Sequence, residues 1–139
     1  MKTSLKYHIP FYSFCLLIFA ESSVPSDAFP KLEFEFSDKI VHMAIYFILF
    51  LTAYYSFNNQ KKFKLLNENV IFTSLVFSVL YGALDEVHQL FVPGRSCDIY
   101  DWLADVAGVI LAIIFLLLIK KFVNNKKNKS YYIAHDTNK

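Results

Sequence analysis

The stretch VIFTSLVFSVLYGALDEVHQLF, residues 70–91, decides which class of fold this chain can adopt. Its first fifteen residues carry no charged side chain, and the adjacent acids Asp85 and Glu86 then follow before the stretch ends. About 20 apolar residues in helical form cross a hydrocarbon core of about 30 Å. Because lipid offers no hydrogen-bond partner to the backbone, a helix is the expected form. We therefore predict a membrane-spanning helix with one polar end.

Three further apolar blocks accompany this stretch. Of the 139 residues, 55% are hydrophobic and 19% are charged, and the apolar blocks lie at residues 7–20, 40–57, 70–91 and 102–123. This pattern predicts an all-α fold, an integral membrane four-helix bundle over residues 1–123. Residues 124–139 are rich in lysine and asparagine, and we expect them to form a basic, disordered cytoplasmic tail.

The first block has a second interpretation. A short apolar run after Lys2 and Lys6 is also typical of a cleavable signal peptide. The bulky Ile18 argues against cleavage after Ala20, whereas cleavage after Ser22 would fit the small residues there. The residues favour a retained helix and leave cleavage as the alternative.

Lysines predict the orientation of the helices, because short basic segments tend to stay in the cytoplasm. The N-terminus, residues 58–68 and the tail from Lys120 are basic, whereas residues 21–39 and 92–101 are acidic on balance. We therefore expect a multi-pass protein of the cell membrane with both termini in the cytoplasm. The polar ends of the second, third and fourth helices would then meet at the outer face.

A set of polar residues would gather at this outer face. An ionisable group within the bilayer costs about 2.5–3.5 kcal/mol on insertion scales, so the adjacent acids Asp85 and Glu86 indicate a site or a polar network. The bland alternative is a set of helix caps and headgroup contacts. We predict that ligand binding uses the following residues: Asp38, Lys39, His42, Asp85, Glu86, His88, Gln89, Arg95, Asp101 and Asp105.

The fourth block combines this acidity with small residues. Asp101 and Asp105 are four apart, on a stripe that continues through Gly108 and Ala112. Small residues at that spacing let helices approach closely. We expect this stripe to face the interior of the bundle.

The predicted set carries excess negative charge. Protonation of an acid, a divalent cation, or Lys39 bending inward would relieve it. Carboxylates and imidazoles suit a metal by type, but their spacing matches no established motif, so we predict no metal site and no cofactor, with a divalent cation as the alternative. If the site is catalytic, the candidates for proton transfer are Glu86, His88, His42 and Asp85. The residues do not decide between binding and catalysis.

The segments DKIVHMAIYFILF, YGALDEVHQLFVPGRS and DIYDWLADVAGVILA, in this order, closely resemble the VanZ-like membrane protein family. The resemblance covers roughly residues 22–115, and ESSVPS resembles the end of that family's first helix, which favours retention of the helix. At Asp105 the family more often has Asn. The resemblance implies a link to resistance against teicoplanin-type glycopeptides through cell-wall remodelling, while the family's biochemical activity is unsettled.

Three functions are compatible with these residues. In the first, the outer site binds or acts on a cell-envelope ligand, such as a lipid-linked or anionic headgroup received by Arg95 and Lys39. In the second, the polar residues form an interhelical network in a structural or assembly protein. A small transporter ranks last, because the cytoplasmic halves of the helices offer few polar residues. Membrane lipid is the expected partner and nucleic acid is not, and the sequence leaves the oligomeric state open.

Overall fold

The structure is a computed structural model that describes residues 5–25 and 37–136. Within these ranges the chain is helical and contains no strand, which confirms the expected all-α class there. The elements in chain order are η1 (Leu5–Tyr7), α1 (Ile9–Ser22), α2 (Ser37–Asn59), α3 (Lys64–Glu68), α4 (Val70–Gln89) and α5 (Ile99–Asp136). Lys2 and most of the expected acidic outer loop, residues 26–36, lie outside the described residues.

Three of the described helices are long and apolar enough to cross a membrane. These segments are Asp38–Asn59, Val70–Gln89 and Ile99–Lys127. The helix α1 is also apolar but has only 14 residues. At about 1.5 Å per residue it is about 21 Å long, less than the thickness of the hydrocarbon core. The described chain thus has three long apolar helices and one short one, where the sequence predicted four spans.

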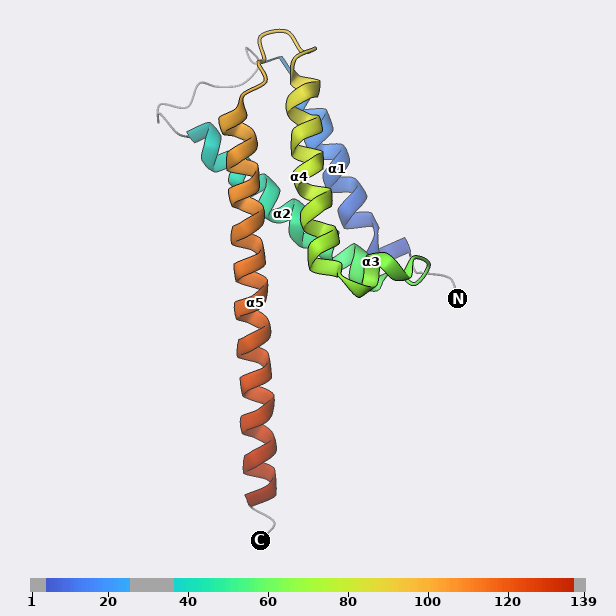
Figure 1. Ribbon diagram of the computed structural model, residues 1–139, viewed down its shortest axis with the longest axis vertical. Coiled ribbons are helices and arrows are strands. Elements are labelled where there is room, and N and C mark those ends of the chain that lie inside the picture. Colours follow the sequence, from blue (N-terminus) through green and yellow to red (C-terminus); the bar gives the residue numbers. More distant parts are fainter. Residues whose placement is uncertain (1–4, 26–36, 137–139) are drawn as a thin grey trace.

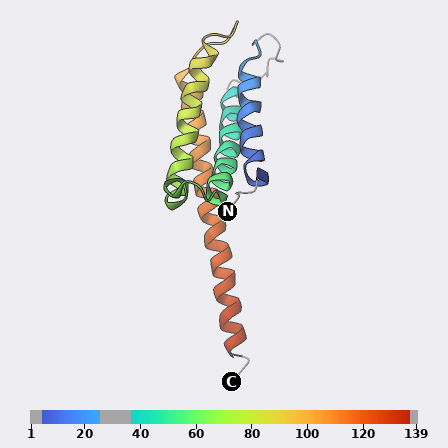
Figure 2. The ribbon, with the colours of Figure 1, turned by 90° about the vertical axis from the view of Figure 1, so that its right-hand side faces the viewer.

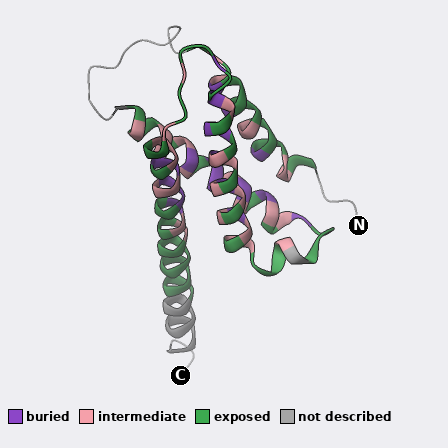
Figure 3. Cartoon of the chain, turned by 45° about the horizontal axis from the view of Figure 1, so that its top comes forward, coloured by how far each residue is buried: buried purple, intermediate pink, exposed green. Residues whose placement is uncertain are grey.

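The long helices pack against one another, and α1 lies against α2 and α4 (Figures 1 and 2). The helix α2 is central because it contacts each of the other three, and its contact with α5 is the most extensive. The core forms where apolar side chains of α1, α2 and α5 meet: Phe11, Ile18, Tyr46, Leu49, Phe50, Ala53, Val109 and Ala112. The four from α2 follow the spacing of one helix face. Figure 3 shows buried positions on the facing sides of the helices and exposed ones outside.

Gly108 explains how α2 and α5 approach so closely. A Cβ added there would lie 2.2 Å from the carbonyl oxygen of Met43, so the two backbones touch at this point. Asp105 and Ala112 on the same stripe are also buried, which confirms that the stripe faces the interior. Val109 is buried as well, so the packed face of α5 is wider than the stripe that the sequence indicates.

The helix α5 reaches Asp136, and residues 137–139 of the expected tail lie outside the described residues. The helix α5 continues through residues 124–136, for which we predicted disorder, and extends well beyond the other helices (Figure 1). The described side chains there, up to Lys127, are exposed, so packing does not hold the helix. No proline or glycine follows Gly108, and the sequence therefore contains no stop signal for the helix.

The two ends of the bundle differ in character. The end of α1 and α4 and the beginning of α2 and α5 lie at one end, which we call the polar end because it carries the predicted site residues. The helix α3 and the beginning of α1 lie at the opposite end (Figures 1 and 2). Gly94, with φ of 75°, occupies the left-handed region in the turn that connects α4 to α5 at the polar end.

Replacing Gly108 with alanine tests the contact between α2 and α5. Alanine is the better helix former by about 1 kcal/mol, yet its Cβ would meet the Met43 carbonyl, and overpacking costs about 1–3 kcal/mol. We expect Gly108→Ala to lower the melting temperature in detergent. Ile110→Ala, at a side chain that is 49% exposed on the same helix, is the control. Equal melting temperatures for the two variants would contradict the contact.

Candidate polar-end site

The three long helices bring acidic and basic side chains together at the polar end. Each contributes residues near its own terminus there: Lys39 and His42 from α2, Asp85 and Glu86 from α4, and Asp101 and Asp105 from α5. These residues are far apart in the sequence. They meet because α2 and α4 run in opposite directions, as do α4 and α5, and this brings the end of α4 to the same end of the bundle as the beginnings of the other two helices.

Lys39 neutralises the rim of the site. Its ammonium group binds Asp98 at 3.0 Å and Asp38 at 3.1 Å, and also contacts the Asp101 carboxylate. Inward bending of Lys39 was one of the three expected ways to relieve the excess negative charge. The structure shows it for the acids at the rim, which Lys39 contacts. The backbone N–H of Tyr100, 2.8 Å from Asp98, and the Lys39 ammonium hold the pKa of the Asp98 carboxyl below its usual range.

His42, Glu86 and Asp105 form the centre of the site, and we call them the central cluster. One possible ligand atom from each lies within 4.8 Å of those of the other two. His42 Nδ1 is 2.9 Å from Asp105 Oδ1, which is hydrogen-bond distance. Glu86 and Asp105 are only 3% and 1% exposed. Each of the three long helices thus supplies one member.

Several oxygen atoms in and beside the central cluster have no hydrogen-bond partner among the described residues. They are Glu86 Oε1, Asp105 Oδ2 and the hydroxyl of Tyr46, all fully buried. The other oxygen of Glu86 accepts a bond of 2.9 Å from the Asp98 backbone. An unpaired buried polar group costs about 1–3 kcal/mol, and more if it is charged. Such a cost at three neighbouring positions indicates that a partner belongs there.

Gly82 keeps space beside these oxygens. A Cβ on Gly82 would lie 3.0 Å from Asp105 Oδ2 and 3.1 Å from a ring carbon of Tyr46. Any larger residue would press on the carboxylate from the α4 side. Gly82 is one helical turn before Glu86, so α4 contributes both an acid and a gap to the same site.

Two further polar residues of α4, Asp85 and His88, face the end of α1 instead. Asp85 Oδ1 accepts a hydrogen bond of 2.6 Å from the Ser22 hydroxyl, and His88 Nε2 is 3.0 Å from the Ser23 hydroxyl. Gln89 is buried beside Asp85. Asp85 and His88 were candidates for proton transfer together with Glu86 and His42, but the structure brings only the latter two into the central cluster.

Arg95 binds groups at the end of α1 and directly after it. Its guanidinium binds the Glu21 carboxylate at 2.7 Å, the Glu21 carbonyl at 3.1 Å and the Val24 carbonyl at 3.2 Å. The side chain is 16% exposed. Arg95 thus connects the turn after α4 to the end of α1. Both Arg95 and Lys39 bind carboxylates of the chain, and the expectation that they receive an anion stays a prediction.

The sequence reasoning missed several members of the site. Glu21, Ser22 and Gly82 were not among the predicted residues. The segment ESSVPS was a signal for the first two, because its polar residues directly follow an apolar helix. Gly82, in contrast, has no signal in the sequence beyond being a glycine one turn from an acid. Asp98 is also absent from the predicted residues, and it binds Lys39 through its side chain and Glu86 through its backbone N–H.

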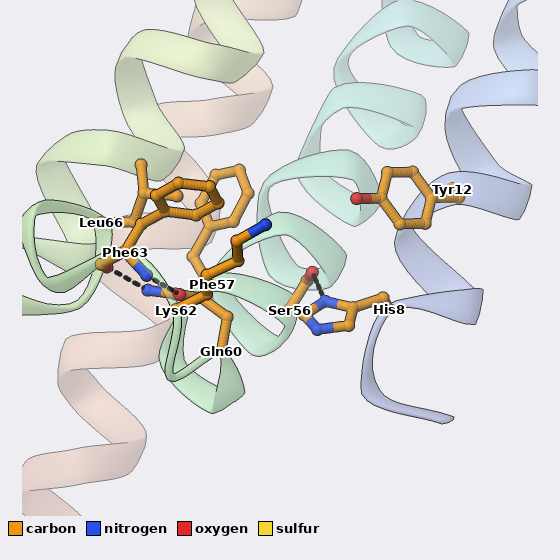
Figure 4. A pocket seen from close by; sticks show the side chains of 8 residues that line it. All are labelled: His8, Tyr12, Ser56, Phe57, Gln60, Lys62, Phe63 and Leu66. Atoms are coloured by element: carbon orange, nitrogen blue, oxygen red, sulfur yellow. Dashed lines mark hydrogen bonds between the residues drawn. The ribbon is translucent and has the colours of Figure 1, made fainter. Parts of the chain in front are cut away.

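A cavity of about 200 Å³ lies at the opposite end of the bundle (Figure 4). Three of its polar side chains are hydrogen-bonded within the chain: His8 Nδ1 is 2.7 Å from the Ser56 hydroxyl, and Gln60 accepts a bond of 2.8 Å from the Phe63 backbone. Neither contact leaves a buried acceptor without a partner. The polar end is therefore the better candidate for a functional site.

Comparison with known proteins identifies a family that this chain matches. A model of the VanZ/LLP1 family matches residues 2–120. Among curated proteins, "Uncharacterized protein C11E3.10" of Schizosaccharomyces pombe is 29% identical over 92 residues, which cover 66% of this chain and 54% of the yeast protein. The matched region is thus about half the length of that relative. No solved structure matches the chain significantly.

Proposed function

The chain belongs to the VanZ/LLP1 family, and we propose that it is a multi-pass membrane protein whose polar end binds the headgroup of a membrane lipid or of a lipid-linked cell-envelope molecule. The observation that carries this proposal is the pair of buried carboxylate oxygens, Glu86 Oε1 and Asp105 Oδ2, that have no partner among the described residues. A stable bundle has no reason to bury such groups unless something else completes them.

The membrane arrangement has four embedded helices, with α1 as the fourth. Contacts at both ends of α1 support this. His8, directly before it, bonds to Ser56 near the end of α2, and Ser22, its last residue, bonds to Asp85 near the end of α4. The helix therefore accompanies the apolar part of the bundle despite its length. The Ser22 bond also supports a retained helix, because cleavage there would remove the partner of Asp85.

The polar end faces outward and both termini lie in the cytoplasm. The exposed lysines Lys61, Lys62 and Lys64 at the opposite end support this orientation, since basic segments tend to remain in the cytoplasm. An outward polar end would meet headgroups of the outer leaflet directly. An accessory role in cell-wall remodelling, which the family resemblance implies, would use this site on a lipid-linked precursor.

Thiol labelling in intact cells tests the orientation. Cys97 is exposed in the turn at the polar end, and we expect a membrane-impermeant maleimide to label it from outside. In a Cys97→Ser background, Lys61→Cys is the matched control at the exposed opposite end and should be labelled only after the cells are opened. Labelling of the Lys61→Cys variant in intact cells would overturn the orientation.

The chemistry of the site favours a positively charged or hydrogen-bond-donating partner. Lys39 and Arg95, the lysine and arginine that the described residues place at the polar end, bind carboxylates of the chain, and the unpaired groups of Glu86 and Asp105 are acceptors. A lipid headgroup that carries an ammonium group or a hydroxyl offers such a partner.

An interhelical network is the second candidate function. It is favoured by the contacts at the rim, where Lys39 connects α2 to α5 and Arg95 connects the α4–α5 turn to α1. Trp102 adds a bond of 3.1 Å from its indole to the Val79 carbonyl. The two candidates differ at the centre, because a network would pair the oxygens of Glu86 and Asp105 within the chain.

Charge-removing variants separate these functions. We expect Glu86→Gln and Asp105→Asn to keep or raise the melting temperature, because they relieve repulsion between buried acids, and to lose a co-purifying lipid that native mass spectrometry detects on the wild type. Lys39→Ala and Arg95→Ala are the contrasting variants. Each leaves carboxylates without a cation, so we expect a loss of about 1–3 kcal/mol in stability.

The opposite pattern would favour the network. If Glu86→Gln and Asp105→Asn lower the melting temperature as much as Lys39→Ala does, and the lipid remains bound, the central cluster is structural. Absence of any bound lipid on the wild type purified from its own membranes in mild detergent would also contradict the proposed function.

A further inference from the structure

We propose that the central cluster of His42, Glu86 and Asp105 binds a divalent transition-metal cation, with Zn²⁺ as the best match. This inference rests on the proposed function in that it uses the same site and names what occupies the unpaired oxygens. The three side chains come from three different helices, so a bound cation would also connect α2, α4 and α5 at the polar end.

The spacing of the cluster is close to that of a ligand set. One nitrogen or oxygen atom from each side chain lies within 4.8 Å of the others. In a tetrahedral site with bonds of about 2.0–2.1 Å, ligand atoms lie about 3.4 Å apart. No two of these ligand atoms therefore have to approach each other by more than about 1.4 Å, and small side-chain rotations provide such a change. His42 and Asp105 are already at hydrogen-bond distance, 2.9 Å.

Burial and charge give independent support. Glu86 and Asp105 are at least 97% buried, and each has one oxygen without a partner among the described residues. Two carboxylates and a neutral imidazole balance the charge of one dication. Lys39 does not neutralise Glu86 and Asp105, because its ammonium group binds Asp38, Asp98 and Asp101 instead. The rim of the site is compensated by Lys39, whereas no lysine or arginine of residues 5–25 and 37–127 pairs with Glu86 or Asp105.

The ligand types select the class of cation. Imidazole suits zinc and its neighbours in the first transition row, whereas Mg²⁺ prefers an all-oxygen octahedron that retains several waters. Three protein ligands leave one position of a zinc site open. A phosphate or hydroxyl oxygen of a headgroup would fill that position. The cation would then supply the positive charge for headgroup binding that Lys39 and Arg95 do not offer.

Metal content and affinity of the full-length protein in lipid nanodiscs provide the test. We expect chelator-stripped wild type to take up one Zn²⁺ per chain, measured by elemental mass spectrometry, and to show a d–d absorption band when Co²⁺ is used instead. Glu86→Gln, Asp105→Asn and His42→Ala should each weaken Zn²⁺ binding at least tenfold. His88→Ala and Asp38→Asn are the matched controls at the same end and should bind as wild type does.

X-ray absorption at the zinc edge of the wild type needs no variant and covers the case in which a variant fails to fold. We expect oxygen and nitrogen ligands that include one imidazole. A sulfur shell, failure of the folded wild type to bind Zn²⁺ at 100 µM, or unchanged affinity in the folded Glu86→Gln and Asp105→Asn variants would overturn the proposal.

The metal assay and the lipid assay distinguish a wrong metal site from a wrong proposed function. Lipid that remains bound to metal-free protein in a Glu86-dependent manner, without any uptake of Zn²⁺, would remove the cation and leave the proposed function standing. One Zn²⁺ per chain without any bound lipid would keep the metal site and contradict the headgroup.

Discussion

The close packing of α2 against α5 is the constraint on which the rest of the structure depends. At Gly108 the backbone of α5 touches the Met43 carbonyl, and no side chain fits between them. Met43 follows His42 directly, and Gly108 is one turn from Asp105. The contact therefore fixes the distance at which His42 and Asp105 meet, and their hydrogen bond of 2.9 Å follows from it. The helix α4 then places Glu86 against this pair.

The polar end separates two tasks by position. At its rim, Lys39 and Arg95 bind carboxylates and backbone groups from other elements, and these bonds hold the ends of the helices together. At its centre, Glu86 and Asp105 keep buried oxygens without partners beside Gly82. Natural proteins accept such a local cost where function needs it. The contacts at the rim stabilise this end of the bundle, and the unpaired oxygens at the centre would bind the ligand that we propose.

The sequence predicted the features that depend on length and on spacing within one helix. Apolar blocks gave the long helices, and the stripe of Asp105, Gly108 and Ala112 gave the packed face of α5. It did not predict how α4 is rotated. Asp85 and Glu86 are adjacent, yet one faces Ser22 of α1 and the other faces α2 and α5, because the neighbouring helices decide this.

Contacts over long sequence distances were also beyond prediction. The pairing of Arg95 with Glu21 joins residues that are 74 positions apart, and nothing in the turn itself indicates it. The first apolar block, residues 7–20, was too short for its length to decide between a retained helix and a cleaved signal peptide. The composition of the tail is typical of disorder, whereas the absence of glycine and proline after Gly108 is compatible with the helix α5 as far as Asp136.

The most direct measurement of the central claim is a high-resolution cryo-electron microscopy map of the full-length protein in lipid, purified without chelators. The account predicts that His42, Glu86 and Asp105 converge at the polar end and that non-protein density contacts Glu86 Oε1 and Asp105 Oδ2. A map in which both oxygens bond only to groups of the chain, with no additional density between them, would contradict it.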